Sequence, residues 1–192
     1  MRFIGDVHAN FNRYLEIIQG CTASIQVGDF GVGFGPVPFV PDGHLFIRGN
    51  HDNPELCRTT RHWAIDGTYF NGTFFLGGGF SVDQHSRTEG VDWWRTEEMT
   101  ISELNKHLDL YIQRRPRVVV SHECPSSVVQ KVISDRSWYS GDSRTAQALG
   151  AMYDFHQPEL WVFGHWHQSV DVKIGNTRFV CVAKNSFIDI PI

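Results

Sequence analysis

The chain has 192 residues and a formal net charge of -4 at pH 7, and 41% of its residues are hydrophobic. This length and composition predict a single domain over residues 1–192 with a sizeable core, and the acidic balance argues against a broadly basic nucleic-acid surface. A local patch or a metal pair could still hold a phosphate backbone, so charge alone leaves nucleic acid open as a partner.

The four cysteines lie far apart and form no Cys-x-x-Cys pair, which argues against a zinc knuckle and favours reduced thiols. The chain runs from Met1 straight into an apolar segment, without the basic and apolar regions of a signal peptide. An apolar stretch of about 18 residues, the length that suggests a membrane span, does not occur. We therefore expect a cytoplasmic protein with no membrane partner.

The N-terminal half predicts alternating strands and a helix. Short apolar runs predict buried strands over residues 3–4, 25–27 and 45–47. Asn10 can cap a helix that ends at Gly20, with an apolar face of Phe11, Tyr14, Leu15 and Ile18. Residues 30–43 contain four glycines and three prolines, which predict an irregular loop across the rim of a site.

The C-terminal half continues the same α/β order. Apolar periodicity predicts helices over residues 100–115, 125–133 and 144–155, strands over 118–121 and 161–163, and an edge strand over 187–190. The pairs Asn71-Gly72 and Gly175-Asn176, each flanked by apolar and β-branched residues, predict two hairpins. Residues 134–142 predict a polar loop.

Polar side chains able to bind metal follow five of the predicted strands. They are Asp6, His8, Asp29, Asn50, His51, His122, His165 and His167. Strands of a mostly parallel sheet share one carboxyl edge, so these distant residues can converge. A structural role is the better explanation for any one of these histidines alone, but mixed carboxylate, amide and imidazole groups at five strand ends favour a metal site.

Two metal ions suit the hydrolysis of phosphate esters. Cations roughly 3.5–4 Å apart lower the pKa of a bridging water and neutralise the phosphoryl oxygens. Such a pair needs a bridging ligand, and Asp29 is the natural candidate because it is a carboxylate between the other groups in the chain.

The chain resembles the calcineurin-like metallophosphoesterases. Its motifs, in chain order, are Asp6-x-His8, Gly28-Asp29, Gly49-Asn50-His51-Asp52, His122 and Gly164-His165-x-His167. The resemblance implies an α/β fold of two packed mixed β-sheets flanked by helices, with a dinuclear metal site at the strand ends. It implies that Asp6, His8, Asp29 and His167 hold one metal, and that Asp29, Asn50, His122 and His165 hold the other. His51 would protonate the leaving oxygen or stabilise its developing charge, and Asp52 would orient His51 and raise its pKa.

Other segments refine the resemblance. Gly77-Gly78-Gly79-Phe80-Ser81-x-Asp83, with Arg87 and Trp93-Trp94, is similar to a compact bacterial and bacteriophage-type subset. The Asp-Arg-Gly that follows the bridging aspartate in phosphoprotein phosphatases is missing here, which argues against a protein phosphatase. A phosphate-binding arginine must then come from elsewhere, and Arg87 is the first candidate and Arg48 the second. The two tryptophans could stack on a base, although packing against the first hairpin is the better explanation.

These observations predict a metal-dependent phosphoesterase. We expect hydrolysis of a phosphodiester, in a nucleotide, a cyclic nucleotide or a nucleic-acid end, by attack of a metal-bound hydroxide. A phosphomonoesterase is the alternative, and a non-catalytic scaffold of the same fold is a third hypothesis. The expected cofactors are two divalent ions, manganese first, with iron, zinc or nickel as alternatives. The oligomeric state is left open.

Overall fold

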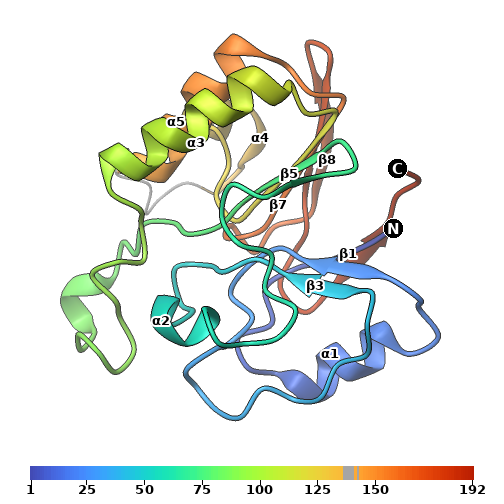
Figure 1. Ribbon diagram of the computed structural model, residues 1–192, viewed down its shortest axis with the longest axis vertical. Coiled ribbons are helices and arrows are strands. Elements are labelled where there is room, and N and C mark those ends of the chain that lie inside the picture. The colour runs from blue at the N-terminus through green and yellow to red at the C-terminus, as the bar shows by residue number, and fades with distance from the viewer. Residues whose placement is uncertain (136–140, 142) are drawn as a thin grey trace.

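Two mixed β-sheets pack face to face at the centre of the molecule, and helices cover their outer faces (Figure 1). The computed structural model describes residues 1–135, 141 and 143–192. Most of the predicted polar loop at residues 134–142 therefore lies outside the described residues. The expected α/β fold of two packed mixed sheets flanked by helices is confirmed.

The smaller sheet contains the three N-terminal strands and the C-terminal strand, in the order β10-β1-β2-β3. These strands are β1 (Arg2–Ile4), β2 (Ser24–Gln26), β3 (His44–Phe46) and β10 (Phe187–Asp189). β1, β2 and β3 are parallel, and β10 pairs antiparallel with β1 as the predicted edge strand. The segments that follow the three parallel strands consequently emerge at the same edge of this sheet.

The larger sheet has the order β4-β5-β6-β7-β9-β8. Its strands are β4 (Tyr69–Phe70), β5 (Thr73–Leu76), β6 (Val118–Ser121), β7 (Leu160–Phe163), β8 (Val170–Ile174) and β9 (Thr177–Cys181). β5, β6, β7 and β9 are parallel, and the two predicted hairpins add β4 and β8 as antiparallel edge strands.

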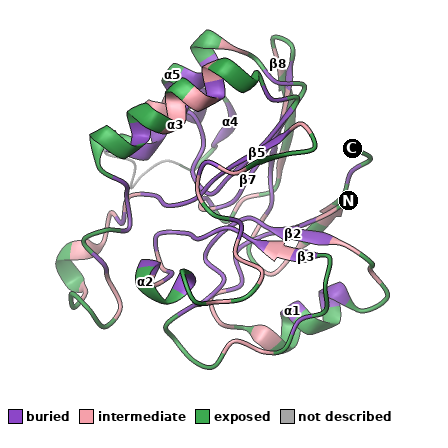
Figure 2. Ribbon diagram, viewed as in Figure 1, coloured by how far each residue is buried: buried purple, intermediate pink, exposed green. Residues whose placement is uncertain are grey.

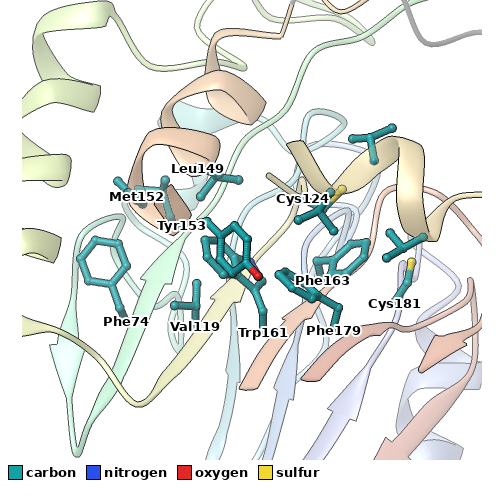
Figure 3. Packing of buried hydrophobic residues seen from close by; sticks show 14 of the residues in the cluster. Phe74, Val119, Cys124, Leu149, Met152, Tyr153, Trp161, Phe163, Phe179 and Cys181 are labelled. Carbon is teal, nitrogen blue, oxygen red and sulfur yellow. The ribbon is translucent and has the colours of Figure 1, made fainter. Parts of the chain in front are cut away.

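Alternate residues of the central strands face two separate cores. In β6, Val118 and Val120 pack between the two sheets, whereas Val119 packs beneath the helices. Trp161 and Phe179 contribute to the helix-facing core, where their rings stack with centroids 5.9 Å apart (Figure 3). Because both faces of these strands are buried, their sequences are continuously apolar rather than alternating (Figure 2).

The helices form the outer layers. α3 (Ile101–Arg114), α4 (Ser126–Val132) and α5 (Arg144–Phe155) lie over the larger sheet, and α1 (Phe11–Ile18) lies on the smaller sheet, with the short helix α2 (Pro54–Cys57) nearby. Thr100 and Glu103 form a capping box at the start of α3. Leu15, expected on the apolar face of the first helix, is 38% exposed. The inward face of α1 is instead made by Tyr14, Ile17 and Ile18.

The glycine- and proline-rich segment at residues 30–43 is irregular, as expected, but most of it lies away from the polar strand ends. With Tyr14, His44 and His62, its residues line a separate cavity of about 700 Å³. Among the helices in the described part of the chain, none has the length and apolar character required to cross a membrane.

Candidate metal centre

The polar residues that follow five different strands lie together at one end of the two sheets. β1, β2 and β3 of the smaller sheet lead to Asp6, Asp29 and Asn50, while β6 and β7 of the larger sheet lead to His122 and His165. The convergence therefore takes place between two sheets, not along the single shared edge that the sequence suggested.

One group of side chains is partly open to solvent. Asp6, His8, Asp29 and His167 each offer a ligand atom within 4.8 Å of the others. The Nε2 atom of His167 lies 3.0 Å from Oδ2 of Asp6 and 3.0 Å from Nε2 of His8. The side chain of His167 is 46% exposed, so this group faces the solvent.

A second group is buried. The Oδ1 atom of Asn50 lies 3.0 Å from Nε2 of His122 and 3.0 Å from Nδ1 of His165. The two imidazole nitrogens are 3.3 Å apart. The His122 side chain is fully buried and that of His165 is only 6% exposed. The two groups therefore differ sharply in their access to water.

Asp29 joins the two groups. Its Oδ1 atom lies 3.5 Å from Nε2 of His122, and its Oδ2 atom lies 3.6 Å from Nε2 of His8. Burial, reinforced by the nearby carboxylates of Asp6 and Asp52, raises the pKa of Asp29 to about 7. A positive charge beside this carboxylate would therefore be strongly favoured.

Glycines precede three of these residues because the site has no room for a side chain there. A Cβ atom would lie 2.2 Å from Nδ1 of His122 if placed on Gly28, and 2.0 Å from Oδ1 of Asp29 if placed on Gly49. On Gly164 it would lie 2.2 Å from an Asp6 oxygen. Each glycine thus lets its strand end approach a side chain from another strand end.

Several of the site residues have strained backbones. His8, Asp29, His165 and His167 all have positive φ angles, between 47° and 66°. This left-handed conformation is unfavourable for residues other than glycine, and such strain is typical of functional sites. The sharp turns it produces direct these side chains into the site immediately after their strands end.

Hydrogen bonds to surrounding residues determine which atoms of the buried group face one another. The Nδ1 atom of His122 donates to the carbonyl oxygen of Val27, 2.9 Å away, which leaves a lone pair on Nε2. The Nδ2 atom of Asn50 donates to Oγ of Ser81, which in turn donates to the carboxylate of Glu97. The amide oxygen of Asn50 is consequently the atom that faces the two histidines.

Glu123 orients His165 in the same way, by a contact with one of its ring nitrogens. Its Oε2 atom lies 3.1 Å from Nε2 of His165, so this nitrogen donates to the carboxylate and Nδ1 faces the buried group. Burial opposes a charge on His165, but the Glu123 carboxylate outweighs it and raises the pKa of His165 to about 9. Without a cation, this pKa places a second proton on Nδ1 of His165, where it can bond to Oδ1 of Asn50, 3.0 Å away. A divalent cation that displaces this proton would be held by Nδ1 of His165, Nε2 of His122 and Oδ1 of Asn50, a set of acceptor atoms that fits such an ion.

Sequence analysis missed Glu97 and Glu123. Glu97 is 3% exposed and Glu123 is 2% exposed. Glu123 had a weak signal, since it follows His122 directly between the apolar residues 118–120 and 128–129, and a carboxylate buried there requires partners. Glu97 had no comparable signal in its polar surroundings.

His51 lies beside this centre and is contacted by Arg87. The Nε2 atom of His51 is 3.9 Å from Oδ2 of Asp29. Arg87 follows the short 3-10 helix η1 (Gln84–Ser86), and its Nη1 atom is 2.5 Å from Nδ1 of His51. Asp83 holds the same guanidinium at 2.7 Å. Burial and the charge of Arg87 lower the pKa of His51.

Asp52 does not have the role expected for it. Its carboxylate accepts hydrogen bonds from the backbone N–H groups of Phe30, Gly31, Val32 and Gly49. None of the described contacts joins Asp52 to the ring of His51, and the pKa of His51 is lowered rather than raised. Asp52 instead ties the segment after β2 to the segment after β3, because four backbone donors there need an acceptor.

Arg48 and Arg87, the two expected substrate ligands, lie in different places. Arg48 is 3% exposed, pairs with Asp66 at 2.7 Å and donates to the carbonyl oxygens of Thr96 and Glu97. Its Nε and Nη1 atoms thus donate within the protein and the side chain is buried, which argues against contact with a substrate. Only Arg87 of the pair reaches the candidate centre.

A pocket of about 600 Å³ opens over the two groups. Its lining includes Asp29, Asn50, His51, His165 and His167 together with Phe80, Val82, Asp83, Asp135 and Gln168.

The ring of Trp94 packs against Phe34, with centroids 5.6 Å apart, rather than against the predicted hairpin.

One solved structure with a similar fold comes from Staphylococcus aureus and is described as a 5′-nucleotidase in complex with alpha-ketoglutarate. The match has a TM-score of 0.54 and 13% identity, and it covers 96% of this chain and 48% of that chain. The chain thus spans about half the length of that protein, and the likeness shows a common fold. No curated protein sequence matches the chain.

The family model described as calcineurin-like phosphoesterase matches residues 2–169, a range that includes every strand end of the candidate centre. The chain therefore belongs to the calcineurin-like phosphoesterases, hydrolases that act on phosphoester bonds.

Proposed function

We propose that this phosphoesterase hydrolyses phosphodiesters with the help of two divalent cations. Asp6, His8, Asp29 and His167 would hold one cation, and Asp29, Asn50, His122 and His165 would hold the other. The observation that carries this proposal is the position of Asp29, whose two carboxylate oxygens each face an imidazole nitrogen of a different group. Mixed oxygen and nitrogen donors suit Mn²⁺, with iron, zinc and nickel as alternatives.

The two cations would supply charge neutralisation for the phosphoryl oxygens and a lowered pKa for water. His51 lies at the mouth of this centre, close enough to Asp29 to reach a phosphoryl group bound there. Because Arg87 and burial keep its pKa low, His51 acts as a neutral hydrogen-bond donor to the leaving oxygen. Arg87 provides the positive charge beside it.

The charge of the pocket favours a diester over a monoester. A phosphodiester carries one negative charge, whereas a phosphomonoester carries close to two at neutral pH. Asp83 lines the pocket and pairs with Arg87, so the arginine that would balance a second negative charge on the substrate is already partly neutralised. Phe80, also in the lining, offers a ring on which a nucleobase can stack. A nucleotide-type diester is therefore the preferred substrate class.

A phosphomonoesterase is the second candidate, because the solved structure with the similar fold is described as a 5′-nucleotidase. The two functions are separated by comparing bis-(p-nitrophenyl) phosphate with p-nitrophenyl phosphate, and cyclic nucleotides with nucleoside 5′-monophosphates, in the presence of Mn²⁺, Fe²⁺, Zn²⁺ or Ni²⁺.

We expect metal-dependent turnover that a chelator abolishes and a higher kcat/KM for the diesters. Faster turnover of the monoesters would replace the diester proposal with the second candidate. Absence of hydrolysis with every metal and both substrate types would overturn both.

A further inference from the structure

Glu123 is a buried carboxylate that faces three specific donors. Its Oε1 atom accepts hydrogen bonds from Nε1 of Trp166 and from the backbone N–H of Cys124, each at 2.9 Å. Its Oε2 atom faces Nε2 of His165 at 3.1 Å. With only 2% of its surface exposed, Glu123 has a fixed position behind the ring of His165.

The position of Glu123 determines which nitrogen of His165 carries a proton. A neutral imidazole has one N–H donor and one acceptor nitrogen. Because a carboxylate accepts at Nε2, the proton of the neutral ring resides there, and Nδ1 is the acceptor. Nδ1 is also the atom that lies 3.0 Å from Oδ1 of Asn50 and 3.3 Å from Nε2 of His122.

We propose that Glu123 is a positioning residue that holds His165 in the Nε2–H tautomer, so that Nδ1 is presented to the cation of the buried group. This inference rests on the proposed metal ligands. Orienting partners of this kind are general in metal sites, where the second nitrogen of a histidine ligand donates to a carboxylate or a carbonyl group. Here they are a carboxylate for His165 and the carbonyl group of Val27 for His122.

The two orienting partners differ in how they can be tested. The carbonyl group of Val27 belongs to the backbone and persists in any variant. The orientation of Asn50 depends on Ser81 and Glu97 in series, so a change there affects more than one hydrogen bond. Glu123 acts directly on one ligand. One isosteric substitution, to glutamine, replaces the acceptor that faces His165 with a donor.

Glu123→Gln is the decisive variant. The amide oxygen of the new side chain should face the two donors, Trp166 and Cys124, which leaves its NH₂ group facing Nε2 of His165. Nε2 must then accept, and the proton moves to Nδ1, where it blocks the cation. An altered outer partner of this kind typically lowers metal affinity about 10–100-fold.

The measurement is calorimetric titration of chelator-treated protein with Mn²⁺, together with electron paramagnetic resonance of the loaded protein. We expect two sites in the wild type, and in Glu123→Gln one site with its dissociation constant raised roughly 10–100-fold while the other is unchanged. The spectrum of coupled manganese ions should be lost at concentrations that saturate the wild type.

Glu98→Gln is the matched control. Glu98 is also buried, but its carboxylate accepts from Oγ of Ser143 and the backbone N–H of Thr145 at the start of α5. Both variants remove one buried negative charge, and both can lower the thermal stability. Only Glu123→Gln should change Mn²⁺ affinity. If Glu123→Gln binds two Mn²⁺ ions with wild-type affinities, the inference is wrong and the proposed function stands.

A measurement on the wild type keeps the inference testable even if Glu123→Gln fails to fold. Long-range ¹H–¹⁵N spectra of the zinc-loaded protein report the tautomer of each histidine. We expect His165 to carry its proton on Nε2, and a proton on Nδ1 would overturn the inference. If the wild type binds neither Mn²⁺ nor Zn²⁺, the proposed metal set itself fails, which is a separate result.

Discussion

The guanidinium of Arg87 lies against the ring of His51, with Nη1 2.5 Å from Nδ1 and Nη2 3.1 Å from Nε2. A histidine paired with an aspartate would gain a proton more readily, whereas a histidine beside an arginine loses it more readily. In the proposed function, the positive charge next to the phosphoryl group would therefore be located on Arg87. Arg87, which sequence analysis proposed as a phosphate-binding residue, thus also contacts His51, a pairing that sequence analysis did not predict.

His51→Ala should leave metal binding intact and lower turnover roughly 10²–10⁴-fold, the range for loss of a proton-transferring or hydrogen-bonding side chain. The side chain is absent from both proposed ligand groups, so two Mn²⁺ ions should still bind in calorimetry. Steady-state kinetics with bis-(p-nitrophenyl) phosphate gives the turnover, and an unchanged kcat would remove His51 from the mechanism.

Arg87→Met should raise the pKa of His51. Burial and the charge of Arg87 are the causes that lower this pKa, so removal of the charge moves it back toward its usual value. The shift is measured by following the His51 Cε1–H resonance of zinc-loaded protein against pH. We also expect kcat/KM to fall roughly 10–100-fold, as for loss of one charge-assisted hydrogen bond. A pKa that stays constant or falls would contradict the proposed pairing.

Asp52→Asn should destabilise the fold by roughly 2–4 kcal/mol, because an amide NH₂ group would then face backbone donors that the carboxylate now accepts. Urea unfolding measures the change. Asp171→Asn is the matched control, since its ion pair with Arg178 is solvent-exposed and should contribute less than about 1 kcal/mol. Equal effects of the two substitutions would show that Asp52 has no special structural role.

Gly49→Ala should disrupt the junction of the two ligand groups. The new methyl group would lie 2.0 Å from Oδ1 and 2.3 Å from the backbone nitrogen of Asp29, so Asp29 must shift. A displacement of this size typically costs roughly 10²-fold in activity. Gly35→Ala is the control, because a Cβ atom there has no neighbour within 4 Å. Wild-type kcat and metal stoichiometry in Gly49→Ala would be inconsistent with the close approach described here.

Metal removal should lower the stability of the protein. Each cation that binds only the folded chain adds about 2.7 kcal/mol at a free concentration about 100-fold above its dissociation constant. Urea unfolding curves with EDTA and with Mn²⁺ should therefore differ, and added Mn²⁺ should reverse the effect of the chelator. Superimposable curves would argue against metal binding to the native state.

Local patterns were sufficient to predict most elements of the fold. The Asn71-Gly72 and Gly175-Asn176 turns each join two antiparallel strands, because these residue pairs favour tight hairpins wherever they occur between strands. The helix at Arg144–Phe155 has the predicted bounds. The division of the strands between two sheets was not encoded in such patterns, since it depends on which apolar faces pack together.

The sequence by itself identified the candidate metal ligands, because each one lies within a few residues of the end of an apolar strand and that context is local. Tertiary structure decided how they are oriented. Glu123 reaches His165 from the segment after β6, the neighbour of β7 in the sheet, and Asp52 meets donors about 20 positions earlier in the chain. The position of Arg48, away from the candidate centre, likewise depends on its ion pair with Asp66. Such contacts depend on how strand ends approach one another in space, and neither residue type nor spacing specifies that approach.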